Sequence, residues 1–380
     1  MSFSEWKEVK LGDLLNFRRG HDLPKTSMSD GAIPVVGSNG VIGFHNVFTT
    51  KAPCLTIGRS GSIGNPCYLN KDCWAHNTTL YVDDFKNNDP KYLYYLLKTL
   101  DLGYYGGGSA VPTLNRNHIH PIMVKSTDNF SDQKAISGTL ASLDDKIEFN
   151  NRINKTLEEM AQVIFKSWFV DFEPFQDGEF EDSELGRIPK GWRVGTLGDI
   201  AYITMGQSPS GSSYNGNNDG IVFYQGRTDF GKRYPTIRLY TTEPKRMAAK
   251  GDILLCVRAP VGDINVASEN CCIGRGLATL KSNNNCNSFL LYQLLNLKDS
   301  FNIYNGEGTV FGSINKDTLK NMRVLIPTDK NIQGFQDTVG KLDEIFENNS
   351  IQIKILTTIR DSLLPKLMSG EIRVPIEEVQ

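Results

Sequence analysis

The residues that could carry out chemistry in this chain form none of the local patterns that catalysis usually requires. An amino-methyltransferase centre needs an Asn/Asp-Pro-Pro-aromatic run. The nearest matches, Asn65-Pro66-Cys67 and Asp89-Pro90-Lys91, lack the second proline and the aromatic residue. A nucleotide-binding loop needs G-x-x-x-x-G-K-[ST] and a zinc protease needs H-E-x-x-H, and neither motif occurs. The sequence therefore predicts no catalytic centre in this chain.

Histidines, glycine-rich loops and cysteines give weaker signals. His118 and His120 alternate in a segment that resembles a strand, where a packing or surface role is favoured over metal ligation. The runs GRSGS at 58–62 and GQSPSG at 206–211 could offer backbone N–H groups to a phosphate, but neither has a strand-to-helix context. The seven cysteines include no Cys-x-x-Cys pair, so we expect reduced, mostly buried thiols and no metal site.

Composition favours a soluble chain of two or three domains. At 380 residues the chain exceeds the usual size of one hydrophobic core. It contains no apolar stretch near the ~18 residues that a membrane span needs. The first residues, MSFSEWKEVK, carry charges where a signal peptide would be apolar, so we expect a cytoplasmic location. The net charge is −2, but residues 1–130 carry +2 and residues 201–286 carry +4, so the basic excess lies in two separate blocks.

The sequence contains an internal duplication. The segment WKEVKLGDLLNFRRG at 6–20 returns as WRVGTLGDIAYITMG at 192–206, which aligns Trp6 with Trp192 and suggests that both are structural anchors. GGGSAVPTLNRNHI at 106–119 returns as GEGTVFGSINKDTL at 306–319, and LDDKIEFNN at 143–151 returns as LDEIFENNS at 342–350. The offset grows from 186 to 200, so the second copy has gained about fourteen residues between Gly206 and Gly306. We expect the copies to differ most in this variable middle.

Each copy ends in a long amphipathic helix. Positions spaced alternately four and three residues apart are apolar at eight of ten places in each copy. They are Ile136, Leu140, Leu143, Ile147, Asn150, Asn154, Leu157, Ala161, Ile164 and Trp168, then Phe335, Val339, Leu342, Phe346, Asn349, Ile353, Leu356, Arg360, Leu363 and Leu367. Pro365 should kink or end the second helix near Leu364. Two such seams at matching places favour packing of the helices on each other over packing of each on its own domain.

Ahead of each helix the pattern changes to short apolar runs punctuated by glycine, which predict strands at 52–58, 78–82, 252–257 and 321–327. The acidic, turn-rich stretch before Trp192 indicates a surface connector. We therefore predict an α+β chain. Its segments are domain 1 (1–130), helix 1 (131–172), a connector (173–191), domain 2 (192–331), helix 2 (332–370) and a tail (371–380).

These features together resemble type I restriction-modification specificity subunits over essentially the whole chain. The similar features are the duplicated layout, the connector ending SELGRIPKGW, the LGD after each tryptophan, the LDDKIEFNN helix and the closing RDSLLPKLMSGEIRV. The resemblance implies two target-recognition domains, each reading half of a split, asymmetric site in double-stranded DNA. It also implies a pair of helices that sets the unread spacer. One departure is that Pro365 in the second helix has Lys166 as its counterpart in the first, so the two helix ends are not expected to dock partners identically.

The same resemblance implies that the chain acts within a larger complex. Two methyltransferase subunits would dock on the helices and their flanks, and restriction/translocase subunits would join them. S-adenosylmethionine, ATP and Mg are expected on these partners, with no cofactor in this chain. The chain would then be a non-catalytic recognition subunit.

Polar side chains in the variable middles are the candidates for DNA contacts, because base edges and phosphates are bound by Arg, Lys, Asn, Gln and Ser. In the first copy they are Arg18, Arg19, Ser38, Asn39, Arg59 and Asn77, with Gly106 to Gly108 as a close backbone approach. In the second copy they are Gln207, Ser208, Tyr214, Asn215, Gln225, Arg227, Arg258 and Arg275. For any single position a solvated loop residue is the plainer interpretation, so the prediction concerns the group.

Asparagines near the middle of the two seams predict how the helices align. Two copies that face one duplex from opposite ends should be related by a pseudo-two-fold axis, which makes their helices an antiparallel coiled coil. Facing residue numbers should then sum to about 503, the sum of the seam midpoints 152 and 351. This places Asn154 across from Asn349, and Asn150 across from Ile353. A polar pair inside an apolar seam would lock the register.

Two other functional classes remain open from the sequence. One is an enzyme whose site is assembled from distant loops. The repeat disfavours this class, because a duplicated centre should repeat its polar residues, and His76-Asn77 does not recur at Gly274-Arg275. The other is a coiled-coil adaptor that binds only protein, which would leave the arginine-bearing variable loops without a purpose. The recognised bases and the spacer length do not follow from the sequence.

Overall fold

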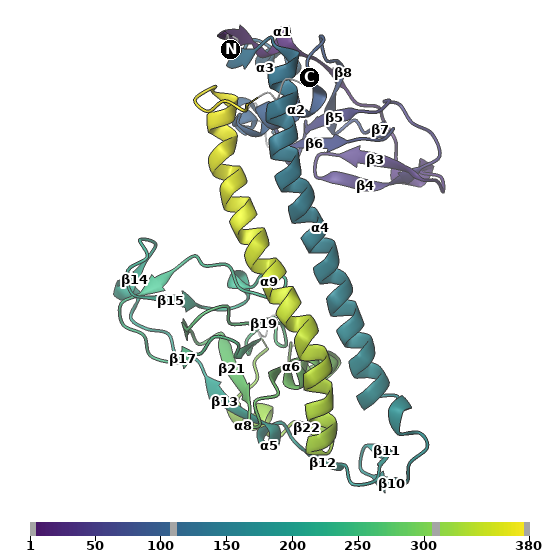
Figure 1. Cartoon of the computed structure of the whole chain (residues 1–380), viewed down its shortest axis with the longest axis vertical. Coiled ribbons are helices and arrows are strands. Elements are labelled where there is room, and N and C mark those ends of the chain that lie inside the picture. Colours follow the sequence, from purple (N-terminus) through teal and green to yellow (C-terminus); the bar gives the residue numbers. More distant parts are fainter. Residues whose placement is uncertain (1–4, 107–111, 306–311, 376–380) are drawn as a thin grey trace. The chain divides into compact units, whose positions relative to one another are not determined.

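The computed structural model describes residues 5–106, 112–305 and 312–375, and the chain divides into two compact units (Figure 1). Unit 1 consists of Met1–Asn151 together with Ser350–Gln380. Unit 2 consists of Arg152–Asn349. Each unit holds the sheets of one sequence copy and a part of both long helices. Gly107 and Gly108, proposed above as a backbone approach to DNA, lie outside the described residues.

Unit 1 contains three sheets, with strand orders β2-β8-β5-β6, β4-β3-β7 and β1-β9. Its strands are β1 (Trp6–Lys10), β2 (Asn16–Arg19), β3 (Ile33–Gly37), β4 (Gly40–His45), β5 (Cys54–Gly58), β6 (Pro66–Leu69), β7 (Trp74–Ala75), β8 (Thr79–Asp84) and β9 (Met123–Thr127). Its short helices are α1 (Leu11–Leu14), η1 (Lys25–Ser27), α2 (Pro90–Lys98), η2 (Leu102–Tyr105) and α3 (Arg116–Ile119).

Unit 2 repeats this plan, with strand orders β13-β21-β18-β19, β14-β16-β15-β20-β17 and β12-β22 and a separate β10-β11 hairpin. Its strands are β10 (Phe180–Ser183), β11 (Gly186–Pro189), β12 (Arg193–Thr196), β13 (Ala201–Met205), β14 (Tyr214–Asn215), β15 (Ile221–Tyr224), β16 (Tyr240–Thr241), β17 (Met247–Ala248), β18 (Ile253–Cys256), β19 (Ile264–Val266), β20 (Cys271–Ile273), β21 (Leu277–Ser282) and β22 (Arg323–Ile326). Its short helices are η3 (Glu173–Phe175), α5 (Leu197–Ile200), η4 (Gly211–Ser213), η5 (Arg227–Asp229), α6 (Asn287–Asn296), α7 (Lys298–Asn302), η6 (Ile303–Asn305) and α8 (Lys316–Lys320).

The runs predicted as strands at 52–58, 78–82, 252–257 and 321–327 are confirmed as β5, β8, β18 and β22. The residues added in the second copy enlarge one sheet, which has five strands in unit 2 and three in unit 1. Both versions keep the same parallel pair, β3 with β7 and β15 with β20. The insertion therefore extends a conserved plan instead of replacing it.

The LGD repeated in the sequence forms the same small structure in each unit. It makes a short helix, α1 or α5, whose aspartate accepts a hydrogen bond from a backbone N–H three residues earlier, from Lys10 to Asp13 and from Thr196 to Asp199. The leucine N–H at the start of each helix donates to the chain before the last strand, from Leu11 to Ile122 and from Leu197 to Met322. The motif therefore fixes the beginning of each domain to its end.

The two long helices are α4 (Phe130–Phe169) and α9 (Asp329–Met368), and within each unit their segments run antiparallel (Figure 1). In unit 1, Asn150 donates to Gln352 at 3.1 Å and Arg360 donates to Asp144 at 2.7 Å. The residue number falls along α4 as it rises along α9, so the segments point in opposite directions.

The pairing of asparagines in unit 2 follows the predicted register. Asn349 Nδ2 donates to Asn154 Oδ1 at 2.9 Å, and Asn154 Nδ2 donates to the carbonyl of Phe346 at 3.3 Å. Asn150 pairs with Gln352, one residue from the expected Ile353. The contacting residue numbers therefore sum to within a few of 503.

Each hydrophobic core is completed by the end of a helix that belongs to the other sequence copy. The unit 1 core contains Ile136 and Leu140 from the start of α4 and also Leu364 and Leu367 from the end of α9. The unit 2 core contains Phe335 from the start of α9 together with residues from the end of α4 such as Phe165 and Phe169. Burial of these side chains joins two distant parts of the sequence in each unit. The units consequently cut across the contiguous domain boundaries expected from the sequence.

Pro365 does not end α9 near Leu364, because the helix continues through it to Met368, close to the end at residue 370 expected for helix 2. A proline inside a helix costs about 3 kcal/mol. Leu364, Leu367 and Met368 are all buried in the unit 1 core, and each contributes about 1.5–3 kcal/mol by its burial. The packing of the last turn therefore outweighs the cost of the proline.

Two expectations about single residue types also need correction. Cys54 and Cys73 are joined in a disulfide, whereas all seven cysteines were expected to be reduced. The two lie 19 residues apart, Cys54 at the start of β5 and Cys73 just before β7, so the fold brings them together although their spacing gave no sign of it. His118 and His120 are not in a strand, since His118 lies in α3 and His120 caps its end. A lone turn of helix after Asn115 explains this, because the asparagine side chain caps it.

Candidate nucleic-acid interface

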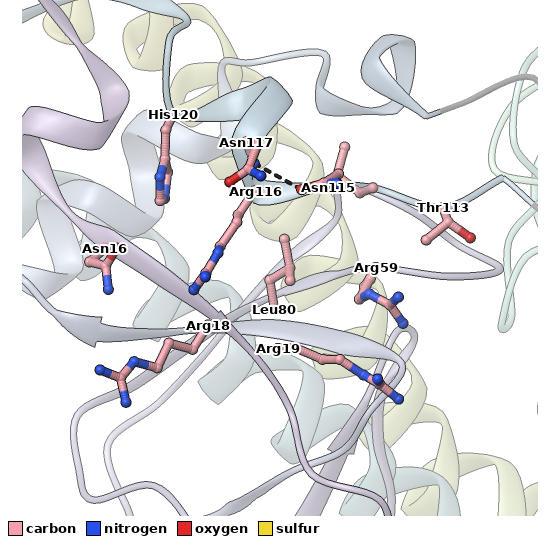
Figure 2. A pocket seen from close by; sticks show the side chains of 11 residues that line it. Asn16, Arg18, Arg19, Arg59, Leu80, Thr113, Asn115, Arg116, Asn117 and His120 are labelled. Atoms are coloured by element: carbon pink, nitrogen blue, oxygen red, sulfur yellow. Dashed lines mark hydrogen bonds between the residues drawn. The ribbon is translucent and has the colours of Figure 1, made fainter.

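A cavity of about 870 Å³ in unit 1 gathers four arginines, three of which the sequence had singled out (Figure 2). Arg18 and Arg19 come from β2, Arg59 follows β5, and Arg116 begins α3. β2 and β5 are both hydrogen-bonded to β8, so the register of one sheet sets the spacing of the first three. Figure 2 shows Arg116 reaching from α3 toward β2, where it donates to the carbonyl of Phe17 at 3.1 Å.

The four guanidinium groups differ in how their charge is balanced. Arg18 forms an ion pair with Asp83, and Arg19 forms one with Asp22 at 3.3 Å. Arg59 and Arg116, by contrast, donate to backbone carbonyls and have no carboxylate partner among the described residues. The cavity therefore carries an excess of positive charge, which favours an anionic ligand.

His120, which also lines the cavity, is held as a neutral acceptor. Its Nε2 accepts a hydrogen bond from the Phe17 N–H at 3.1 Å, and its ring stacks on Phe17. Partial burial and the positive charges of Arg116 and Lys86 lower the pKa of His120 below its usual value. The described residues contain no group of three or more His, Cys, Asp or Glu side chains that could hold a metal ion.

The other predicted residues of unit 1 lie outside the cavity lining. Ser38 and Asn39 form the turn between β3 and β4. Asn77 lies between β7 and β8, where its side chain donates to Asp22 and its carbonyl accepts from Arg59 at 3.3 Å. Asn77 therefore contacts both Arg59 and Asp22, the ion-pair partner of Arg19. Its carbonyl helps to hold the guanidinium of Arg59 in place.

The predicted residues of unit 2 divide into local and clustered positions. Tyr214 donates to the carbonyl of Pro209 at 3.0 Å and Asn215 accepts from nearby backbone groups, so both stabilise their own loop. Ser208 Oγ accepts from the Arg275 N–H at 3.2 Å, and Gln207 N–H donates to Ile273, which brings these three together. Gln207 and Ser208 follow β13, and Arg275 follows β20.

The two remaining arginines of unit 2 have other partners. Arg227 forms an ion pair with Asp263, and Arg258 pairs with Ser313 through a backbone bridge. Gln225 directly follows β15, and its N–H donates to Asp229 at 2.7 Å. A cavity of about 200 Å³ in unit 2 is lined by other residues, including Arg233 and Asp343.

Sequence reasoning missed two arginines. Arg116 was inside the repeated segment 106–119, but the glycines and Asn115 of that segment were used only to align the copies. A comparison of charge at matched positions would have found it, because its counterpart is Lys316. Arg233 is 5% exposed and binds Asp343 and Glu158, and its position in an inserted loop gave no sign of burial.

Comparison with known proteins identifies the family. The model of the type I restriction modification DNA specificity domain matches the chain twice, over residues 3–159 and 189–355. The chain belongs to this type I specificity family. The two matched segments correspond to the two sequence copies. No helix within the described residues combines the length and apolar character that a membrane crossing requires.

Members of the type I specificity family are similar over most of the chain. The type I restriction enzyme MjaIX specificity subunit of Methanocaldococcus jannaschii is 31% identical, with 86% of this chain and 77% of that protein covered. The HindI specificity subunit of Haemophilus influenzae is 26% identical, with 74% and 77% covered. The crystal structure of the S subunit of a type I restriction-modification system from M. genitalium has the same fold, with a TM-score of 0.70, 17% identity and 96% of each chain covered.

Proposed function

We propose that this chain is the non-catalytic DNA-recognition subunit of a type I restriction-modification complex. The observation that carries the proposal is the double match to a DNA specificity domain, on two units whose sheets follow a common plan. Each domain reads one half of a bipartite, asymmetric site. The same framework surrounds different variable loops in the two units, as expected of two readers with separate targets.

DNA contacts are assigned to the variable loops and the strand ends beside them. In unit 1 the arginine cavity offers cations of the kind that bind guanine edges or phosphates. The proposed contact residues are Arg18, Arg19, Ser38, Asn39, Arg59 and Asn77 in unit 1 and Gln207, Ser208, Tyr214, Asn215, Gln225, Arg227, Arg258 and Arg275 in unit 2.

The long helices act as the spacer of the recognition site. We assign them to an antiparallel coiled coil, and Asn150, Asn154 and Asn349 to its register. The antiparallel segments within each unit and the Asn154–Asn349 hydrogen bond support this assignment. A slipped register would place each amide against hydrocarbon, which costs free energy.

The helices also carry the docking surface for two methyltransferase subunits. In unit 1, Ile351, Ile355 and Ile359 recur at every fourth residue of α9 and are 40–53% exposed, and Phe149 of α4 is half-exposed. An exposed apolar stripe of this kind favours burial by another protein. Restriction/translocase subunits then join the complex. S-adenosylmethionine, ATP and Mg belong to these partners, and the complex works in the cytoplasm.

Exchange of one domain tests the proposal. Residues 20–130 are replaced by the equivalent segment of another family member, and the methylated sequence is mapped in cells that carry the partner subunits. Only one half of the methylated site should change. A change in both halves would contradict separate reading. Methyl transfer or cleavage by the purified chain without partners would contradict the non-catalytic role.

A further inference from the structure

A basic residue occupies the same place in both units, at the start of the short helix before the last strand. Arg116 begins α3 and Lys316 begins α8. The preceding asparagines cap both helices, since Asn115 accepts from Asn117 N–H at 3.0 Å and Asn315 accepts from Thr318 N–H at 2.8 Å. Both basic side chains are exposed, and neither has a carboxylate partner among the residues that the structure describes.

The other three arginines of the unit 1 cavity have no such counterpart. The hydrogen bond from Leu114 N–H to the Arg59 carbonyl matches the one from Ile314 N–H to the Val257 carbonyl, so Arg59 corresponds to a buried valine. At the repeat offset of 186, Arg18 and Arg19 of β2 correspond to Thr204 and Met205 of β13. Of the four cavity arginines, only Arg116 therefore has a basic counterpart in unit 2.

The position of these basic residues is set by the repeated framework and not by the variable loops. The residues at the ends of the short helices, His120 after α3 and Lys320 as the last residue of α8, pack against Gly12 and Gly198 of the LGD motifs. A Cβ added at Gly12 would lie 2.9 Å from His120, and one added at Gly198 would lie 2.3 Å from Lys320. The close approach at Gly12 favours glycine, and in both units the short helix lies against the start of its domain.

Two domains that read different bases still meet the same sugar-phosphate backbone. Phosphate contacts position a protein on DNA and carry no sequence information, whereas base contacts give specificity. A cation at the same position in both domains is suited to bind the phosphates, because these are the same in every target sequence. Resting on the proposed function, we propose that Arg116 and Lys316 each bind a DNA phosphate and supply affinity that is independent of sequence.

The local geometry of Arg116 suits an anion. Its Nη1 donates to the Phe17 carbonyl, which orients the guanidinium at the wall of the 870 Å³ cavity (Figure 2). Arg59 lines the same cavity and also lacks a carboxylate partner in the described part of the chain. Arginine can bind a phosphate through two parallel hydrogen bonds, and the lysine of unit 2 would bind as a point charge.

The test measures DNA affinity of the full chain and of its variants R116Q, K316Q and the double variant. One duplex carries the methylated site identified in cells, and a second has both half-sites scrambled. Each single change should weaken binding to both duplexes by the same factor, about three- to tenfold, and lower the slope of log affinity against log salt by about 0.9. R116K and K316R, which keep the charge, should retain most of the affinity.

Lys125 supplies the matched control. It is exposed on β9, and its counterpart in unit 2 is Leu325, so the charge is not shared. K125Q should bind both duplexes as the wild type does. Loss of affinity for the matched duplex alone in R116Q or K316Q would overturn the proposal, since it would indicate base reading. Unchanged affinity would also overturn it. A wild-type chain that does not distinguish the two duplexes would instead contradict the proposed function.

Discussion

Tyr95 and Tyr292 occupy matching places in α2 and α6, and each donates its hydroxyl to an aspartate on a long helix. Tyr95 binds Asp144 at 2.8 Å, and Tyr292 binds Asp343 at 2.9 Å. The cation that completes each pair has a different origin, because Asp144 receives Arg360 from α9 whereas Asp343 receives Arg233 from the inserted loop. Each of the two matching aspartates is therefore paired with an arginine, but the two arginines come from positions that do not correspond in the repeat.

Arg233 is the more deeply buried of the two cations. It donates to Asp343, Glu158 and the Tyr292 hydroxyl and lies 4.0 Å from the centre of the Phe346 ring. Burial opposes its charge, but the neighbouring oxygens outweigh burial and raise its pKa further above its usual value. The loop that carries Arg233 is thereby fastened to both long helices within unit 2.

R233M should lower the free energy of unfolding of unit 2 by about 1–3 kcal/mol, because the variant leaves partly buried acceptors without their cation. Urea unfolding, followed through the fluorescence of Trp168 and Trp192, measures the change. R187M is the matched control, since Arg187 is exposed on β11, and its effect should stay within about 0.5 kcal/mol. Equal effects of the two substitutions would show that the network contributes no net stability.

His120 should make stability depend on pH below about 6.5. Its pKa is lowered in the folded chain by burial, Arg116 and Lys86, so as pH falls the unfolded chain takes up a proton first. The free energy of unfolding should therefore be unaffected by this group above its unfolded pKa and should decrease below it. H120Q should reduce the loss of stability between pH 7.5 and 5.5 in urea unfolding. Identical losses in variant and wild type would rule out this contribution.

The residues that follow from the sequence are those with local geometric roles. The LGD aspartates and the capping Asn115 and Asn315 recur with their neighbours, so the repeat exposes them directly. Arg233 does not follow from local sequence, because a lysine-arginine loop with no apolar period looks solvent-exposed. Its burial depends on acceptors more than 50 residues away in the chain.

At the scale of elements, the hydrogen bond between Asn154 and Asn349 couples α4 to α9. N349L removes the donor to Asn154 Oδ1 and should lower the free energy of unfolding by about 1–3 kcal/mol. The double variant N154L/N349L should recover part or all of that loss, because two apolar side chains can pack without a polar partner. A double-mutant cycle in urea measures the coupling. Strictly additive effects would contradict a direct pairing of the two side chains.

Helix periodicity was the most informative sequence signal at this scale. An apolar spacing of four and three residues persists across ten positions in each copy, and it predicts both helices and their facing residues. The continuation of α9 through Pro365 depends on tertiary packing, because a proline signal is local whereas the burial of Leu364, Leu367 and Met368 is tertiary. The strand pattern was likewise visible, but its division into three sheets per unit was not.

At the scale of the whole molecule, the proposed spacer role predicts a response to helix length. Four residues inserted into one long helix near its central asparagine add ~6 Å along that helix. At ~3.4 Å per base pair the preferred spacer should lengthen by one or two base pairs. Mapping of methylated sites in cells with the variant and its partner subunits measures the spacer. An unchanged spacer in an active variant would contradict the role of the helices in setting it.

The compact units could not have been predicted from the sequence copies alone. Each copy has its own sheets and its own helix, so the duplication suggests two contiguous domains. The exchange of helix ends between the cores depends on the antiparallel direction of the helices. That direction places Phe165 beside Phe335 in unit 2 and Asp144 beside Arg360 in unit 1.

The exchanged helix ends determine the order in which the two cores can close during synthesis. Unit 2 is one continuous stretch, Arg152–Asn349, whereas unit 1 needs residues on both sides of it. At ~5–20 residues per second, the ribosome adds the 198 residues of unit 2 in about 10–40 s. During that time the hydrophobic core of unit 1 lacks Leu364, Leu367 and Met368. The domain that is made first is therefore the last to be completed, and a chain terminated early near residue 350 would leave its N-terminal domain open while its C-terminal domain is whole.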